Sequence, residues 1–184
     1  MTVPRRTTAL AAVTAGGLIF AGQVGEIAFG SPSALVDVLY VLAFAGGVVA
    51  LGIALWGLRD LAAPTRYVQA GFGIALAGLA LLGLFMIQAL VEVARTGEVP
   101  ENFALFGLGF LLAIVGHLLF ARGLRSRLGR IWLFPLVAAA GAVAAIVIPV
   151  DPYHDIGLVI FEAAWMGLGL TLLRLERPGR RPRS

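Results

Sequence analysis

Cysteine and lysine are absent from this chain of 184 residues, and charge of either sign is scarce. Without cysteine, the chain has no disulfides, thiolate metal sites, iron–sulfur clusters or cysteine nucleophiles. Charged residues make up 13% of the chain and hydrophobic residues 60%, whereas a typical soluble domain has about 25% charged residues. This composition excludes an ordinary soluble domain and indicates a protein embedded in a bilayer.

Six long apolar stretches carry most of the hydrophobic residues. A transmembrane helix needs about 20 apolar residues, because 1.5 Å of rise per residue must cross roughly 30 Å of hydrocarbon. These stretches are continuously apolar, whereas the strands of membrane barrels are short and alternate polar with apolar residues. The sequence therefore predicts an all-α integral membrane protein, a single bundle over residues 1–184. The predicted spans are residues 7–25, 38–58, 67–91, 102–121, 131–150 and 156–173.

The connectors between these spans alternate in charge. Every arginine except Arg95 lies before span one or after spans two, four and six. Because short loops rich in basic residues stay in the cytoplasm, both termini are predicted to be cytoplasmic, in a multi-pass protein of the plasma (inner) membrane. Residues 174–184 form a basic tail that we expect to be disordered and close to anionic lipid. No aromatic-rich basic groove accompanies the arginines, so nucleic acid is not an expected partner.

Small residues recur four apart within several spans. Such faces let helix backbones approach closely in lipid, either within one bundle or against a partner membrane protein or a second copy. The pairs include Ala43 with Gly47, Gly71 with Ala75, Gly73 with Ala77 and Gly141 with Ala145. Pro135, near the start of span five, is expected to begin a helix rather than to kink one.

Glu162 is the carboxylate placed deepest within a predicted span, about 12 Å along the helix from its outer end. Inserting an acidic residue at the bilayer centre costs about 2.5 to 3.5 kcal/mol, so Glu162 should face the bundle and be protonated or paired. Asp155 lies seven residues earlier, on the same face of the helix. Together they predict one side of a path from the outer surface to the bilayer centre.

Other polar side chains gather at the predicted outer ends of the spans, in pairs that each share a helix face. If these faces point inward, they form an acidic vestibule able to attract a cation or shuttle protons. The alternative for each carboxylate is that it caps a helix and faces water. The pairs are Gln23 with Glu26, Asp37 with Tyr40, and Gln88 with Glu92.

The connector before span six holds the densest group of titratable side chains, with Asp151, His154 and Asp155. Pro152 indicates a turn there, after which Asp155 can cap the last helix. A metal site is the alternative, but the spacing of metal-binding motifs is missing, and we predict neither a metal nor another cofactor. His117, in span four, is expected to be a hydrogen-bonded donor between helices, nearer the cytoplasm than the outer cluster.

No catalytic Ser/His/Asp set, phosphate-binding loop or nucleotide motif is present, so we predict no catalytic residue and expect that the chain is not an enzyme. The leading hypothesis is a proton- or cation-linked transporter or channel, in which Glu162 and the outer carboxylates form the path. One alternative is a non-catalytic partner or assembly subunit of a membrane complex. Another is an intramembrane enzyme acting on a lipid or isoprenoid, with Glu162 or Asp155 as the acid.

Overall fold

The computed structural model describes residues 2–29, 34–96, 104–125, 128–147 and 153–176, all of them in helices, turns or short connections. For residues 25–29, 34, 36–37, 153–155 and 176 it describes the backbone alone. The helices are α1 (Arg5–Phe29), α2 (Ala34–Leu61), α3 (Arg66–Thr96), α4 (Ala104–Leu124), α5 (Leu133–Val147) and α6 (Tyr153–Glu176), with a 3-10 turn, η1 (Gly129–Trp132), before α5.

Six helical segments in the described chain are long and apolar enough to cross a membrane, the fifth of them being η1 and α5 together. This confirms the predicted all-α, multi-pass architecture. Several helices extend beyond the predicted spans; α3, for example, continues to Thr96, whereas the sequence placed the end of its span at residue 91. The helices are longer because helical hydrogen bonding continues into the headgroup region, while hydropathy marks only the hydrocarbon core.

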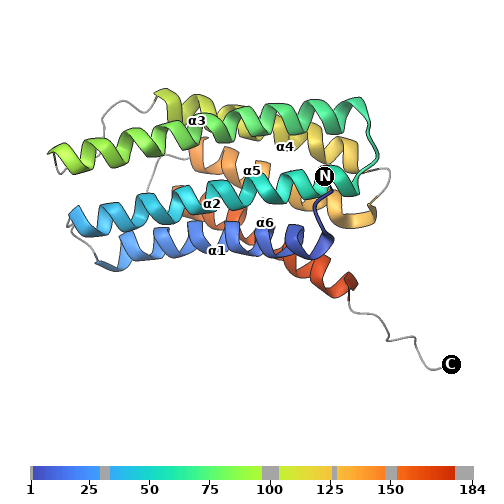
Figure 1. Ribbon diagram of the computed structural model, residues 1–184, viewed down its shortest axis with the longest axis horizontal. Coiled ribbons are helices and arrows are strands. Elements are labelled where there is room, and N and C mark those ends of the chain that lie inside the picture. Colours follow the sequence, from blue (N-terminus) through green and yellow to red (C-terminus); the bar gives the residue numbers. More distant parts are fainter. Residues whose placement is uncertain (1, 30–33, 97–103, 126–127, 148–152, 177–184) are drawn as a thin grey trace.

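The helices form a closed ring in chain order. Each helix packs against the next, and α6 returns to pack against α1 (Figure 1). The tighter interfaces are α1–α2, α3–α4, α5–α6 and α1–α6, and the looser ones are α2–α3 and α4–α5. Large side chains such as Leu55, Phe120 and Trp165 fill the interior and are fully buried.

Glycine brings the backbones of α3 and α4 into direct contact. A β-carbon on Gly71 would lie 2.5 Å from the backbone nitrogen of Phe120, and one on Gly78 would lie 2.6 Å from the carbonyl oxygen of Gly109. Such separations are shorter than van der Waals contact, so neither site accepts a side chain without moving a helix. The predicted small-residue face at Gly71 and Ala75 therefore does lie in a helix interface.

Two other expectations from small residues and proline had different outcomes. Gly73 has open space where its β-carbon would be, and both it and Ala77 are exposed, so this pair does not pack against another helix within the ring. Packing of this face against a partner protein or a second copy stays a prediction. Gly73 and Ala77 lie two residues from the Gly71–Ala75 face, a rotation of about 200° around the helix. Pro135 falls in the first turn of α5, as expected, where its missing N–H costs no helical hydrogen bond.

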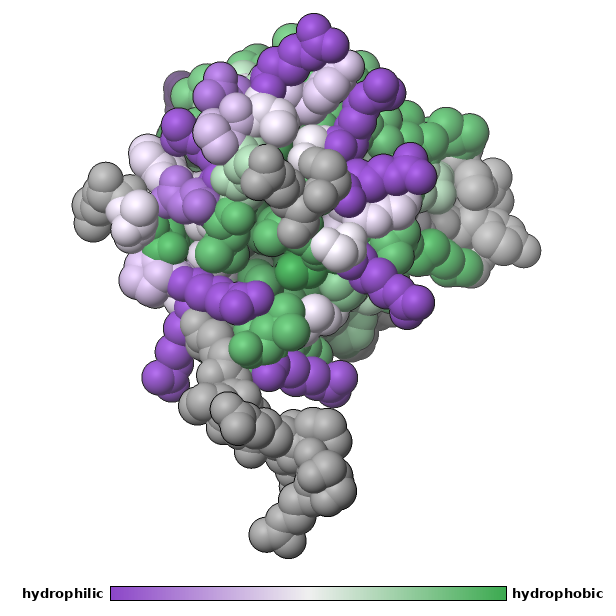
Figure 2. All heavy atoms as spheres, turned by 90° about the vertical axis from the view of Figure 1, so that its right-hand side faces the viewer, coloured by the Kyte–Doolittle hydropathy of each residue, from purple (hydrophilic) through white to green (hydrophobic). Residues whose placement is uncertain are grey.

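One end of the ring, here called the basic end, carries every described arginine except Arg95, which lies in the last turn of α3 at the opposite end. Its charged side chains face the viewer in Figure 2, surrounding apolar surface. The start of α1 and the end of α6 both lie there (Figure 1). The arginines are Arg5, Arg6, Arg59, Arg66, Arg122, Arg125, Arg130 and Arg174.

Aromatic rings anchor several of these arginines at the basic end. The Tyr67 ring lies between Arg66 and Arg122, whose guanidinium carbons are 5.0 and 4.8 Å from its centroid. Arg125 lies 5.3 Å from the Trp132 ring centroid in the same way. The contact between Tyr67 and Arg122 links α3 to α4 at the basic end of the bundle.

Candidate functional site: the buried polar core

Glu162 lies inside the ring, with no exposed surface. It is located on α6 where that helix meets α1, and a β-carbon on Gly16 of α1 would lie 2.5 Å from the Glu162 carbonyl oxygen. Any larger residue at position 16 would therefore push α1 away at the level of Glu162. The side chain neither faces lipid nor reaches the surface, in keeping with the insertion cost of an acidic residue in hydrocarbon.

Two of the predicted vestibule residues lie near one another along the paired helices α1 and α2. Gln23 on α1 is buried, with 6% of its surface exposed. Tyr40 on α2 lies beside the neighbouring residue Gly22, whose β-carbon would be 3.3 Å from the tyrosine ring. In contrast, Gln88 and Glu92 lie on α3 and are only half-buried.

Five predicted site residues lie outside the described side chains: Glu26, Asp37, Asp151, His154 and Asp155. Asp151 falls in the undescribed connector before α6, and the other four are described only as helical backbone. Convergence of the outer carboxylates therefore stays a prediction. The predicted basic tail, residues 174–184, likewise lies outside the described residues from position 177 onward.

His117 is a second buried polar residue, and the sequence did not mark it as part of the site. Only 1% of its surface is exposed, and its Nδ1 lies 2.6 Å from the carbonyl oxygen of Ala113. The expected bond between helices is thus wrong, because Ala113 lies one turn earlier on α4 itself. A carbonyl oxygen only accepts, so Nδ1 carries the proton and the neutral ring presents a lone pair at Nε2. Nε2 has no hydrogen-bond partner among the described residues.

Two aromatic side chains of α6 hold the His117 ring. The Phe161 and Trp165 ring centroids are 5.9 and 5.4 Å from the histidine centroid, and the Trp165 ring is nearly perpendicular to it, at 85°. These residues stand on either side of Glu162 in the sequence. His117 and Glu162 therefore lie at the same level of the ring, and we call His117, Glu162 and Trp165 the buried polar core.

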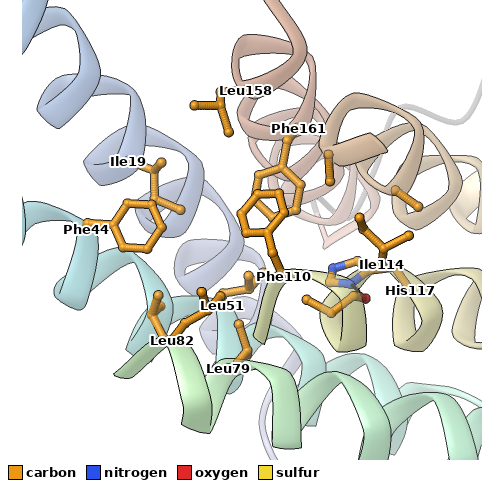
Figure 3. A pocket seen from close by; sticks show the side chains of 14 residues that line it. Ile19, Phe44, Leu51, Leu79, Leu82, Phe110, Ile114, His117, Leu158 and Phe161 are labelled. Carbon is orange, nitrogen blue, oxygen red and sulfur yellow. Dashed lines mark hydrogen bonds between the residues drawn. The ribbon is translucent and has the colours of Figure 1, made fainter. Parts of the chain in front are cut away.

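A small cavity of about 20 Å³ lies at the centre of the ring, beside His117 (Figure 3). All six helices contribute side chains to its wall, including Ile19 from α1, Leu79 from α3 and Ala142 from α5. Among the described residues that line it, His117 alone has a polar side chain. The cavity is consequently an apolar space with one hydrogen-bond acceptor in its wall.

Aromatic side chains continue from His117 towards the end of the helix bundle opposite the basic end. Phe110 lies 6.4 Å from Phe161 and 5.4 Å from Phe106, between ring centroids. Phe44 in turn lies 6.3 Å from both Phe106 and Tyr40. Because these rings fill the space between Tyr40 and His117, a solute could follow this route only if they moved.

Neither a metal-binding group nor similarity to known proteins indicates what this site does. Within the described part of the chain, no group of three or more His, Asp or Glu side chains is placed to hold a metal ion. No family model matches the chain, and neither does any curated protein or solved structure. A function has to be argued from the buried polar core.

Proposed function

We propose that the protein is a proton-linked transporter of the plasma membrane, with Glu162 as its proton-binding residue. The observation that carries this proposal is the complete burial of Glu162 inside an apolar ring of helices. An ionisable side chain there costs free energy that an apolar residue of similar volume would not. Residues of this kind are retained mainly on ion and proton pathways.

The surroundings of Glu162 support a transporter in preference to an open channel. Buried Gln23 and half-buried Tyr40 supply polar atoms at the outer ends of α1 and α2. The carboxylates Glu26, Asp37 and Asp155 are the groups predicted to deliver protons to these polar atoms. Packed aromatic rings fill the interior between Tyr40 and His117. Transport through such an interior requires a conformational change, as in a carrier.

Orientation is part of the proposal. The basic end would face the cytoplasm, because arginine-rich connectors resist translocation. Reporter fusions after Arg66, Arg130 and Ser184 should then give a cytoplasmic signal, and one at Gly97 an external signal. A cytoplasmic signal at Gly97 would contradict the six-span topology.

Proton flux into liposomes tests the function. The purified protein would be reconstituted into liposomes that enclose a pH-sensitive dye. A potassium diffusion potential would drive proton flux, and a small-molecule cell extract would be added as a source of substrate. We expect wild-type flux well above that of empty liposomes, and Glu162→Gln should reduce it to the empty level because the variant keeps the shape but cannot titrate. Asp60→Asn is the matched control, since Asp60 is an exposed carboxylate near the end of α2 and belongs to none of the predicted site pairs, and it should retain flux.

Two outcomes would overturn the transporter. Equal flux in wild type and Glu162→Gln would remove the assigned role of Glu162. Wild-type liposomes indistinguishable from empty ones, together with a membrane protein that co-purifies in fixed ratio, would instead favour a partner or assembly subunit.

A further inference from the structure

We propose that the central cavity is a binding site for one small, neutral molecule that donates a hydrogen bond to Nε2 of His117. In the resting protein this molecule is water. The site is separate from the proposed proton-binding role of Glu162, and it does not depend on transport activity.

The geometry of His117 defines the chemistry of the ligand. The bond from Nδ1 to the Ala113 carbonyl oxygen fixes the tautomer, so that Nε2 is an acceptor. Phe161 and Trp165 hold the plane of the ring. A buried acceptor with no protein partner costs free energy, and buried polar atoms normally meet a donor. The required donor is an O–H or N–H group.

The cavity defines the size and charge of the ligand. Its volume of about 20 Å³ exceeds the roughly 10 to 15 Å³ that one water requires, but it leaves no room for a larger solute. Buried waters usually make two to four hydrogen bonds, and this one would have His117 alone as a partner, so we expect it to be weakly held. Apart from His117, the side chains that line it carry no polar or titratable group. An ion would lack a counter-charge there, so the ligand is neutral.

A route from the bilayer to this cavity lies between α2 and α3. A groove of about 520 Å³ on the outside of these helices shares Val48 and Leu79 with the cavity wall. The groove faces outward, since its residues Val49 and Ile53 are exposed. Two side chains at one of the looser interfaces thus separate the bilayer from His117, and a small neutral molecule can dissolve in hydrocarbon and enter there.

Nitrogen-15 magnetic resonance in bilayers tests the site directly. His154→Gln leaves His117 as the one histidine, so that a histidine-labelled sample reports on it alone. We expect a proton on Nδ1, an Nε2 signal characteristic of a hydrogen-bond acceptor, and magnetisation transfer to Nε2 from exchangeable water protons. Transfer from a protein proton instead, such as the Trp165 indole N–H, or no transfer at all, would overturn the proposal.

Filling the cavity provides a second measurement with a matched control. Ala142→Val adds volume at the cavity wall and should abolish the water transfer and shift the Nε2 signal towards that of a free acceptor. Ala140→Val, on the exposed face of the same helix, should leave both unchanged. An Ala142→Val spectrum identical to that of the parent would contradict the assignment, and if this variant fails to fold, the parent measurement still decides.

The entry route has its own test. Val48→Phe should slow the replacement of the bound water when the sample is moved into deuterated buffer, because a larger side chain thickens the wall between groove and cavity. Leu42→Phe, exposed on α2 outside the groove, serves as the control. Equal exchange rates in the two variants would place the entrance elsewhere.

Discussion

The helices α2 and α4 occupy comparable places in the first two hairpins, yet they differ at one position in the cavity wall. Each contributes three large side chains at the same spacing, and each ends in Gly-Leu-Arg with the leucine fully buried. The corresponding residues are Phe44 with Phe110, Val48 with Ile114, and Leu51 with His117. Leu51 fills the corresponding place in the first hairpin, so this pattern of packing does not itself require a histidine, and His117 is the polar member of the two sets.

The two helices also differ in how they meet the first helix of their hairpin. On α4 the contact with α3 is backbone on backbone, because Gly78 approaches the carbonyl of Gly109. On α2 the contact with α1 passes mainly through side chains. A β-carbon on Gly46 would meet only the end of the Leu18 side chain, at 3.1 Å, and one on Gly47 would meet the Ile19 side chain at 2.5 Å before the carbonyl oxygen of Ala15 at 3.3 Å. The α3–α4 hairpin should therefore be the more rigid of the two.

The largest effect on stability is expected from adding a methyl group at a glycine where two helix backbones touch. Gly78→Ala should destabilise the protein by about 1 to 3 kcal/mol, the typical cost of overpacking, because helix backbones would have to separate. Gly46→Ala should be neutral or stabilising by up to about 1 kcal/mol, since alanine favours the helix and Leu18 can move. Thermal unfolding in detergent, followed by tryptophan fluorescence, measures both, and equal shifts would show that the hairpins do not differ in this way.

The next largest effect on stability is expected from exchanging leucine and histidine at the matching cavity positions, Leu51 and His117. Leu51→His should destabilise by about 1 to 3 kcal/mol, because it buries a polar ring in a site shaped for leucine. His117→Leu should change stability by less than about 1 kcal/mol, since it removes a buried polar group along with its hydrogen bond. Unfolding of the two variants under the same conditions provides the comparison. A large loss in His117→Leu would mean that the histidine is structural.

The smallest effect concerns the basic end of the second hairpin. Tyr67→Leu removes the cation–π contacts with Arg66 and Arg122, so a small fall in melting temperature is expected. Tyr67→Phe keeps the ring and removes only the hydroxyl that accepts a 3.3 Å hydrogen bond from Arg66, and it should be nearly neutral. The comparison is made by melting temperature at low and high salt. A fall as large in Tyr67→Phe would assign the stability to the hydroxyl.

The helices were predictable because a helix that crosses the bilayer must be apolar over the thickness of the hydrocarbon core. Continuous apolar runs marked all six spans, and the small face at Gly71 and Ala75 was correctly placed in an interface. The pair Gly73 and Ala77 has the same spacing but lies on the outer surface. Spacing alone fixes which residues share a face, and only packing against a neighbour decides whether that face is inside.

The site was only partly predictable. The burial of Glu162 follows from its place in an apolar run, since exposure to lipid is costly. His117 was predicted to lie nearer the cytoplasm than the outer cluster, and this stays a prediction because the side chains of that cluster are outside the described ones. The sequence did not indicate that His117 lies at the level of Glu162. Its contacts with Phe161 and Trp165, beside Glu162, are tertiary and left no sequence signal.

The most direct test of the central claim is infrared difference spectroscopy on the purified protein in bilayers, with the pH of the medium stepped up and down. If Glu162 binds and releases a proton, wild type will show a reversible carbonyl-stretch band of a protonated carboxyl group that shifts in deuterated buffer and disappears in Glu162→Gln. Asp60→Asn, at an exposed carboxylate outside the predicted site, should retain the band. A spectrum in which Glu162→Gln matches wild type would contradict the account, because the buried carboxyl group would then take no part in proton exchange.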